Sequence, residues 1–144
     1  LEVIEQVKLL GNGKHRVIFK NINAPTNIVI DTKFFKQIIA NLLSNAIKYS
    51  PNSTEVNFTI SQISDLQPRL LLEFKDYGIG IPEIDQEKIF EHFYRAHNVG
   101  MIAGTGLGMA IIKNSIDILG GTIQLTSVEN KGTTVRVKLP ISMD

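Results

Sequence analysis

Cysteine and tryptophan are absent from this sequence of 144 residues, and only 7% of its residues are aromatic. The lack of cysteine excludes disulfide bridges, thiolate metal sites and a thiol nucleophile. No apolar run approaches the roughly 18 residues that a membrane span needs, and Met109–Ile112 is among the longest. The N-terminus also lacks the basic and apolar regions of a secretion signal. The sequence therefore predicts a soluble domain without direct membrane contact.

Neither sign of charge is in excess, because 15 Lys and Arg stand against 14 Asp and Glu and the formal net charge is +1. This balance gives no broad attraction to nucleic acid or to an acidic membrane, so neither is an expected partner. A chain of 144 residues has room for one domain with a single core. It begins with Leu1 rather than Met, which indicates a piece of a longer polypeptide.

Apolar and polar residues alternate in five segments, which indicates strands with one solvent-exposed face. These segments are 17–19, 56–60, 70–74, 123–125 and 135–139. Helical spacing marks residues 32–50 and 107–119, and a shorter helix is expected over 85–93. The pattern predicts an α+β protein, a two-layer α/β sandwich in which about three helices cover one face of a mixed, mostly antiparallel sheet.

The helix expected over residues 32–50 carries a polar row beside its apolar stripe. Successive members of this row are four, four and three residues apart, and they are Gln37, Asn41, Asn45 and Lys48. Such spacing places them along one side of the helix. Two interpretations fit: a solvated polar face, or an amide-lined row that ends in Lys48 and Tyr49 and faces a phosphorylated ligand. The helix alone does not decide between them.

The segment Asp76–Pro82 reads DYGIGIP and follows directly on the predicted strand 70–74. Its two glycines, Gly78 and Gly80, permit positive φ and let a ligand approach the backbone without a Cβ in the way. A simple turn with a solvated Asp explains the same letters, so this segment is weak support for a binding site when taken alone.

The segment Gly104–Gly108 reads GTGLG and opens the second long helix. Glycine-rich backbone at a helix N-terminus presents free N–H groups and the positive end of the helix dipole to a phosphate. It is not a Walker A loop, because no Gly-Lys-Ser/Thr follows, and it is not a Rossmann fingerprint, because a loop precedes it. The pattern indicates a phosphate site of another kind.

Taken in order, these segments resemble the ATP-binding catalytic (HATPase_c) domain of sensor histidine kinases, a member of the GHKL ATPase superfamily with the Bergerat fold. The matching segments are 35–51 (N box), 76–82 (first glycine box), 89–95 (F box), 104–111 (second glycine box) and the closing strands 120–123 and 132–140. The resemblance implies an ATP-binding catalytic domain over residues 14–144. It also implies that residues 1–13 form the junction to an upstream dimerisation and phosphoacceptor domain, which is missing from this chain.

The resemblance further implies individual roles. Asp76 would accept a hydrogen bond from the adenine amino group, and Asn45 would bind Mg²⁺ through its amide oxygen. The implied catalytic residues are Asn41, Asn45, Lys48 and Arg95. The other implied ATP-binding residues are Tyr49, Gly78, Gly80, Ile81, Gly104, Thr105, Gly106, Leu107, Gly108 and Thr133.

The amide at Asn41 stands where the hydrolysing branch of the superfamily has a glutamate that activates water, and an amide cannot accept that proton. The resemblance therefore implies transfer of the γ-phosphoryl group to a histidine. None of the three histidines, His15, His92 and His97, lies in the His-Glu/Asp-x-x-x-Pro context of the phosphoacceptor.

The implied partners are that phosphoacceptor domain and the receiver domain of a response regulator, in the cytoplasm, whether or not the parent protein is anchored in a membrane. Two alternatives stay open: a non-catalytic nucleotide-binding module for signalling or dimerisation, and a serine kinase of the anti-sigma-factor type.

Overall fold

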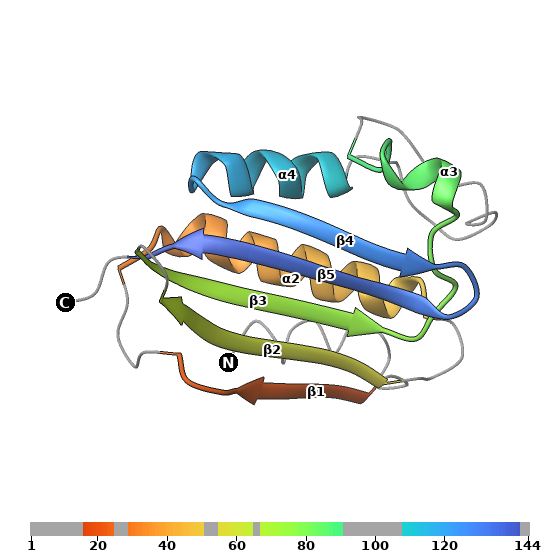
Figure 1. Ribbon diagram of the computed structural model, residues 1–144, viewed down its shortest axis with the longest axis horizontal. Helices are drawn as coiled ribbons and strands as arrows, with labels where there is room; N and C mark the ends of the chain where they lie inside the picture. Colours follow the sequence, from red (N-terminus) through yellow and green to blue (C-terminus); the bar gives the residue numbers. More distant parts are fainter. Residues whose placement is uncertain (1–15, 25–28, 51–54, 65–66, 91–107, 142–144) are drawn as a thin grey trace.

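The computed structural model describes residues 16–24, 29–50, 55–64, 67–90 and 108–141 (Figure 1). Their elements are, in chain order, β1 (Arg16–Asn21), α2 (Thr32–Lys48), β2 (Glu55–Ser64), β3 (Pro68–Asp76), α3 (Glu83–Gln86), α4 (Gly108–Ile118), β4 (Thr122–Val128) and β5 (Gly132–Pro140). The two long helices begin and end within two residues of the predicted bounds. The short helix was predicted over 85–93 but begins earlier and covers only 83–86, and residues 91–93 lie outside the described ranges.

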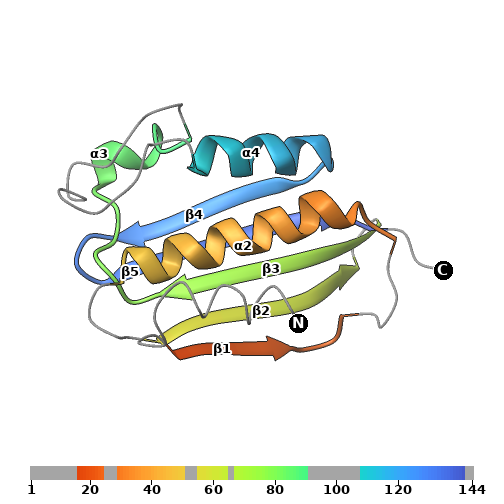
Figure 2. The same ribbon diagram turned by 180° about the vertical axis from the view of Figure 1, so that it is seen from behind.

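The strands form one five-stranded sheet in the order β1-β2-β3-β5-β4. β1 pairs with β2 in parallel, and the other neighbours pair antiparallel. Figures 1 and 2 show α2 and α4 on the same side of this sheet, with α3 near the end of β4. The structure therefore confirms the predicted two-layer sandwich with a mixed, mostly antiparallel sheet.

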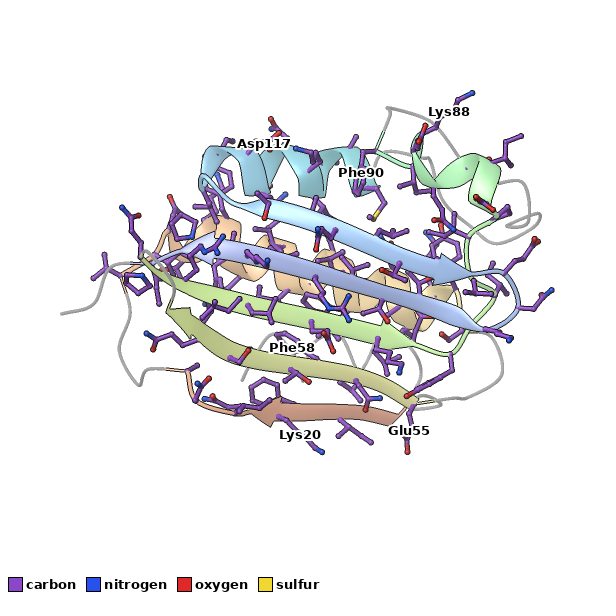
Figure 3. The ribbon with its side chains drawn as sticks, viewed as in Figure 1. Lys20, Glu55, Phe58, Lys88, Phe90 and Asp117 are labelled. Carbon is purple, nitrogen blue, oxygen red and sulfur yellow. The ribbon has the colours of Figure 1, made fainter. Side chains whose placement is uncertain are left out.

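The core lies between the sheet and the two long helices because alternate strand residues point to the same face. Phe58 of β2 stacks on Phe74 of β3, with ring centroids 4.5 Å apart, and neither side chain is more than 2% exposed (Figure 3). Ile39 and Leu43 of α2 and Ile112 of α4 belong to the same cluster. Burial of this apolar face holds the helices on the sheet.

One feature of the sequence sets where α2 begins, and another sets which of its faces packs on the sheet. Asp31 caps its N-terminus, since its carboxylate accepts hydrogen bonds from the N–H groups of Lys33 (3.0 Å) and Phe34 (3.4 Å). The buried residues of the helix recur at helical spacing, and its remaining face carries the polar row. Figure 2 shows that the C-terminal ends of α2 and β3 lie at the same edge of the core.

The other face of the sheet is polar. Arg136 of β5 donates to Glu73 of the neighbouring strand β3 at 2.8 Å, and both side chains are partly exposed. Within the described ranges, no helix has the length and apolar character that a membrane crossing requires.

Candidate functional site

The site is centred on Asp76, the last residue of β3. Strand register places Asp76 opposite Val56 of β2 on one side and Thr133 of β5 on the other. Phe74, two residues earlier, points into the core, so by strand alternation Asp76 lies on the same face. The sheet thus carries a carboxyl group at the boundary of its apolar core.

Burial raises the pKa of the Asp76 carboxyl from 3.8 to about 6, and hydrogen bonds from backbone N–H groups of Gly78 and Thr133 oppose the rise. The Gly78 donor lies 3.0 Å from Asp76 Oδ1. Loss of water disfavours the charged form more than these two donors favour it. The result is a half-buried hydrogen-bond acceptor that titrates near the physiological range, a property common at functional sites.

The C-terminal end of the polar row of α2 reaches the loop that follows this carboxyl, because Tyr49 contacts Ile79. Asn41, Asn45, Lys48 and Tyr49 are all half-buried, so they belong to neither the core nor a fully solvated face. Asn45 Nδ2 donates to Met109 Sδ at 3.3 Å, which joins the last turns of α2 to the first turn of α4. Lys48 Nζ lies 5.4 Å from the centroid of the Tyr49 ring. Amide, ammonium and aromatic groups therefore gather at one end of the helix.

The loop after β3 rests directly on the end of α2. The N–H of Ile79 donates to the carbonyl oxygen of Tyr49 at 3.1 Å. A Cβ at position 78 would collide with that same carbonyl oxygen and would lie 2.7 Å from Ser50 Oγ. Gly78 is therefore required because helix and loop pack backbone to backbone.

Gly80 has a different requirement. Its φ is +69°, and a Cβ there would collide with the carbonyl oxygen of Val128 at the end of β4. The sequence pattern predicted that Gly78 and Gly80 clear space for a ligand. In the structure, a Cβ added at either residue would point at protein backbone instead. The predicted positive φ is present at Gly80.

Three polar contacts that the sequence did not predict converge on Ser127 of β4. The N–H of Ile81 donates to Ser127 Oγ at 2.7 Å, and this oxygen lies 3.0 Å from the carbonyl oxygen of Gly132. Thr133 Oγ1 is 2.8 Å from it. No sequence signal points to Ser127, because its role depends on strand pairing and not on local spacing.

Several predicted site residues lie outside the described residues. They are Arg95 and the second glycine box from Gly104 through Thr105 and Gly106 to Leu107. Gly108 is described and begins α4, close to Met109 and therefore to Asn45. The structure thus brings together Asp76, the end of α2, the start of α4 and Thr133. The predicted junction, residues 1–13, is also outside the described ranges.

A cation at this site would depend on few protein ligands. Among the described residues, no group of three or more His, Cys, Asp or Glu side chains is arranged to hold a metal ion. The Asn45 amide fits a Mg²⁺ ion that is bound mainly by phosphate and water, because Mg²⁺ takes oxygen ligands and keeps several waters. Its Nδ2 is directed at Met109 Sδ, which fixes the amide plane and makes Oδ1 the atom suited to a cation.

Comparisons with known proteins show which family the chain belongs to. The family described as histidine kinase-, DNA gyrase B-, and HSP90-like ATPase matches residues 30–143. Sensor histidine kinase WalK of Bacillus subtilis (strain 168) is 42% identical over 115 residues, which make up 78% of this chain and 19% of WalK. The chain thus spans less than a fifth of the length of this relative.

Two solved structures are similar over nearly the whole chain. The catalytic domain of histidine kinase ThkA is 28% identical with a TM-score of 0.75, and the match covers 96% of this chain and 90% of that one. The mycobacterial sensor histidine kinase MprB is 24% identical with a TM-score of 0.78, and the match covers 97% and 91% of the two chains. The latter likeness shows the shared fold.

Proposed function

Because the chain belongs to the histidine kinase-, DNA gyrase B- and HSP90-like ATPase family, we propose that it is the catalytic domain of a sensor histidine kinase. In this proposal it binds Mg-ATP and delivers the γ-phosphoryl group to a histidine on a separate domain. The observation that carries the proposal is the half-buried Asp76 carboxyl beside Thr133, one layer away from the amide row of α2.

The base would bind at Asp76. Its carboxylate is an acceptor on the apolar face of the sheet, and an exocyclic amino group of adenine is a matching donor. Burial strengthens such a hydrogen bond and makes its loss costly. Thr133 and Ile81 lie at the same place, since both contact Ser127. The half-buried ring of Tyr49 supplies apolar surface close by.

The phosphates would bind between α2 and α4. Asn45 Oδ1 would ligate Mg²⁺, which neutralises phosphate charge when bound, and Asn41 would face the phosphates from one turn earlier. Lys48 supplies a point charge at the end of the row. The N-terminus of α4 begins at Gly108 and favours negative charge. The roles of Arg95, Gly104, Thr105, Gly106 and Leu107 rest on the sequence pattern.

Transfer is favoured over hydrolysis because Asn41 offers an amide where a base would have to stand. Phosphoryl transfer depends mainly on positioning and charge neutralisation, which the amides and Lys48 can supply. A serine kinase of the anti-sigma-factor type and a non-catalytic module are the alternatives that the experiments below must reject.

The proposed partners follow from the reaction. An acceptor histidine would come from a dimerisation domain joined through residues 1–13, and the receiver domain of a response regulator would take the phosphate from it. Residues 14–144 would then be the catalytic domain. We place it in the cytoplasm, where ATP is available.

Nucleotide titration tests the binding site. We expect Mg-ATP to bind the chain below millimolar concentration in calorimetry, and Asp76→Asn to weaken binding by about 1–3 kcal/mol because a buried partner is lost. Asp117→Asn is the matched control, since Asp117 is exposed on α4, where it pairs with Lys113 one turn away at 2.6 Å (Figure 3). Absence of ATP binding, or equal affinities of wild type and Asp76→Asn, would contradict the proposal.

Phosphoryl transfer needs its own test. The chain is mixed with labelled ATP and a candidate phosphoacceptor domain, and the product is treated with acid. We expect an acid-labile phosphohistidine, and Asn45→Ala should abolish its formation in Mg²⁺ while leaving the fold intact by circular dichroism. An acid-stable product would favour the serine kinase, and a chain that binds ATP without transfer to any acceptor would favour the non-catalytic module.

A further inference from the structure

We propose that Ser127 is a positioning residue for nucleotide selection: it holds the Thr133 hydroxyl as a hydrogen-bond acceptor beside Asp76, so that the site favours adenine over guanine. This inference rests on the proposed nucleotide site and adds a residue to it. Ser127 lies in β4, on an outer strand of the sheet, and is separated from Asp76 by β5.

Ser127 Oγ makes three polar contacts, and its single proton decides the direction of each. A hydroxyl has one proton to donate and two lone pairs to accept with. Ser127 Oγ accepts from the N–H of Ile81 at 2.7 Å. The carbonyl oxygen of Gly132, 3.0 Å away, can only accept, so it takes the Ser127 proton.

The Thr133 hydroxyl must then be the donor in the third contact. Its Oγ1 lies 2.8 Å from Ser127 Oγ, and the Ser127 proton is already directed at Gly132. Only this arrangement satisfies all three contacts of Ser127 at once. The single proton of the Thr133 hydroxyl is thereby donated to Ser127, and the Thr133 oxygen can act only as an acceptor toward a ligand.

Two acceptors therefore lie side by side on the inner face of the sheet. Register pairs Thr133 with Asp76, whose carboxylate is an acceptor when ionised. Adenine presents an amino group at the position where guanine presents a carbonyl oxygen. A pair of acceptors attracts the amino group and repels the carbonyl oxygen, which is how a site rejects the wrong partner as well as binding the right one. A freely rotating Thr133 hydroxyl would instead offer its proton to guanine.

Gln86 of α3 holds this arrangement in place. Its Nε2 donates to the carbonyl oxygen of Ile81 at 2.9 Å and to that of Ser127 at 3.0 Å. The loop after β3 is therefore tied to Ser127 of β4 twice, directly through the N–H of Ile81 and indirectly through the side chain of Gln86. Such a clamp keeps Ser127 Oγ within reach of Ile81 and Thr133.

The test compares affinities for ATP and GTP in the presence of Mg²⁺, measured by displacement of a fluorescent ATP analogue. We expect Ser127→Ala to reduce the preference for ATP over GTP by about fivefold, the effect of one neutral hydrogen bond. Ser127→Thr keeps the hydroxyl and should keep most of the preference. Thr126→Ala, the exposed neighbour on the same strand, is the matched control and should leave it unchanged.

If Ser127 only supports the fold, its replacement should change the affinities for ATP and GTP to the same extent. If Ser127→Ala weakens ATP and GTP equally, the proposal is overturned. Thr133→Val should lower the same preference by a similar factor, and adding Ser127→Ala to it should lower it no further, because Ser127 acts through Thr133. A preference unchanged in Thr133→Val also overturns the inference, even if Ser127→Ala does not fold. Wild-type chain that fails to bind ATP would reject the proposed function itself, a result separate from any change in preference.

Discussion

At the scale of single residues, the buried carboxyl of Asp76 costs stability, and its proposed role in binding adenine would explain why it is there. Burial raises the pKa of its carboxyl to about 6 in the folded chain, against 3.8 without that environment. Between these values the folded state holds a proton that the unfolded state has released, so stability falls as the pH rises through this window. Above pH 6 the folded protein contains a half-buried carboxylate held by two backbone donors. The proposed binding role and the stability of the fold therefore place opposite demands on this position.

The Asp76→Asn variant separates the effect of the carboxyl on nucleotide binding from its effect on stability. We expect it to lose the fall in stability between about pH 4 and pH 6, and to gain on the order of 2–3 kcal/mol over wild type at pH 7.5, because the burial that raises the pKa of the Asp76 carboxyl to about 6 no longer opposes folding. Urea unfolding at several pH values measures this. If Asp76→Asn follows the wild-type pH profile, the carboxyl is not the group that titrates.

At the scale of elements, the site is assembled where the end of a helix meets the loop after a strand. The hydrogen bond from Ile79 to Tyr49 and the contact at Gly78 hold the β3 loop on α2. This contact between the β3 loop and the end of α2 lies between the proposed base site and the proposed phosphate site. Its geometry depends on a residue without a side chain, because the Tyr49 carbonyl occupies the place of a Cβ.

Gly78→Ala should disrupt this contact. We expect a loss of about 2–4 kcal/mol in the free energy of unfolding together with weaker ATP binding, since loop or helix must move to admit the methyl group. Gly120→Ala is the control: its φ is +77°, but its Cβ would meet only Pro140 Cγ at 3.6 Å. Backbone strain alone should cost it about 1–2 kcal/mol, with ATP affinity unchanged. Equal effects of both variants in calorimetry and urea unfolding would show that packing at Gly78 is unimportant.

At the scale of the whole molecule, a single apolar core supports both the sheet and the site. Phe58 belongs to this core: its ring stacks on Phe74 and its centroid lies 5.3 Å from that of Phe19, and residues of α2 and α4 are part of the same cluster. Asp76 follows Phe74 by two residues on the same strand. The position of the proposed base site is therefore coupled to the packing of this core.

Phe58→Ala should destabilise the fold by about 3–5 kcal/mol, because it removes a fully buried ring and leaves a cavity. Circular dichroism and nucleotide binding are expected to be lost at the same urea concentration, as one cooperative unit requires. Thr59→Ala, next to it on the polar face, should cost less than about 1 kcal/mol. Loss of binding well before loss of helix signal would show that the site unfolds independently of the core.

The sequence alone determined the class of fold, and it predicted the main parts of the candidate site. Period-two alternation and helical spacing are local properties, so residues 32–50, 70–74 and 135–139 were recognisable without neighbours. The order of the boxes pointed to Asp76 and to the row from Asn41 to Lys48. Arg95 and Gly104–Leu107 remain predictions from that pattern.

Only the tertiary structure decided how these parts act on one another. The raised pKa of Asp76 comes from burial, which no local pattern encodes. Gly78 is required by a carbonyl that lies 29 positions away in the chain, at Tyr49, and Ser127 meets Ile81 across 46 positions. Such contacts are set by strand register and by the packing of α2 on the sheet. They exist only after the chain has closed these long loops, which is why the sequence gives no sign of them.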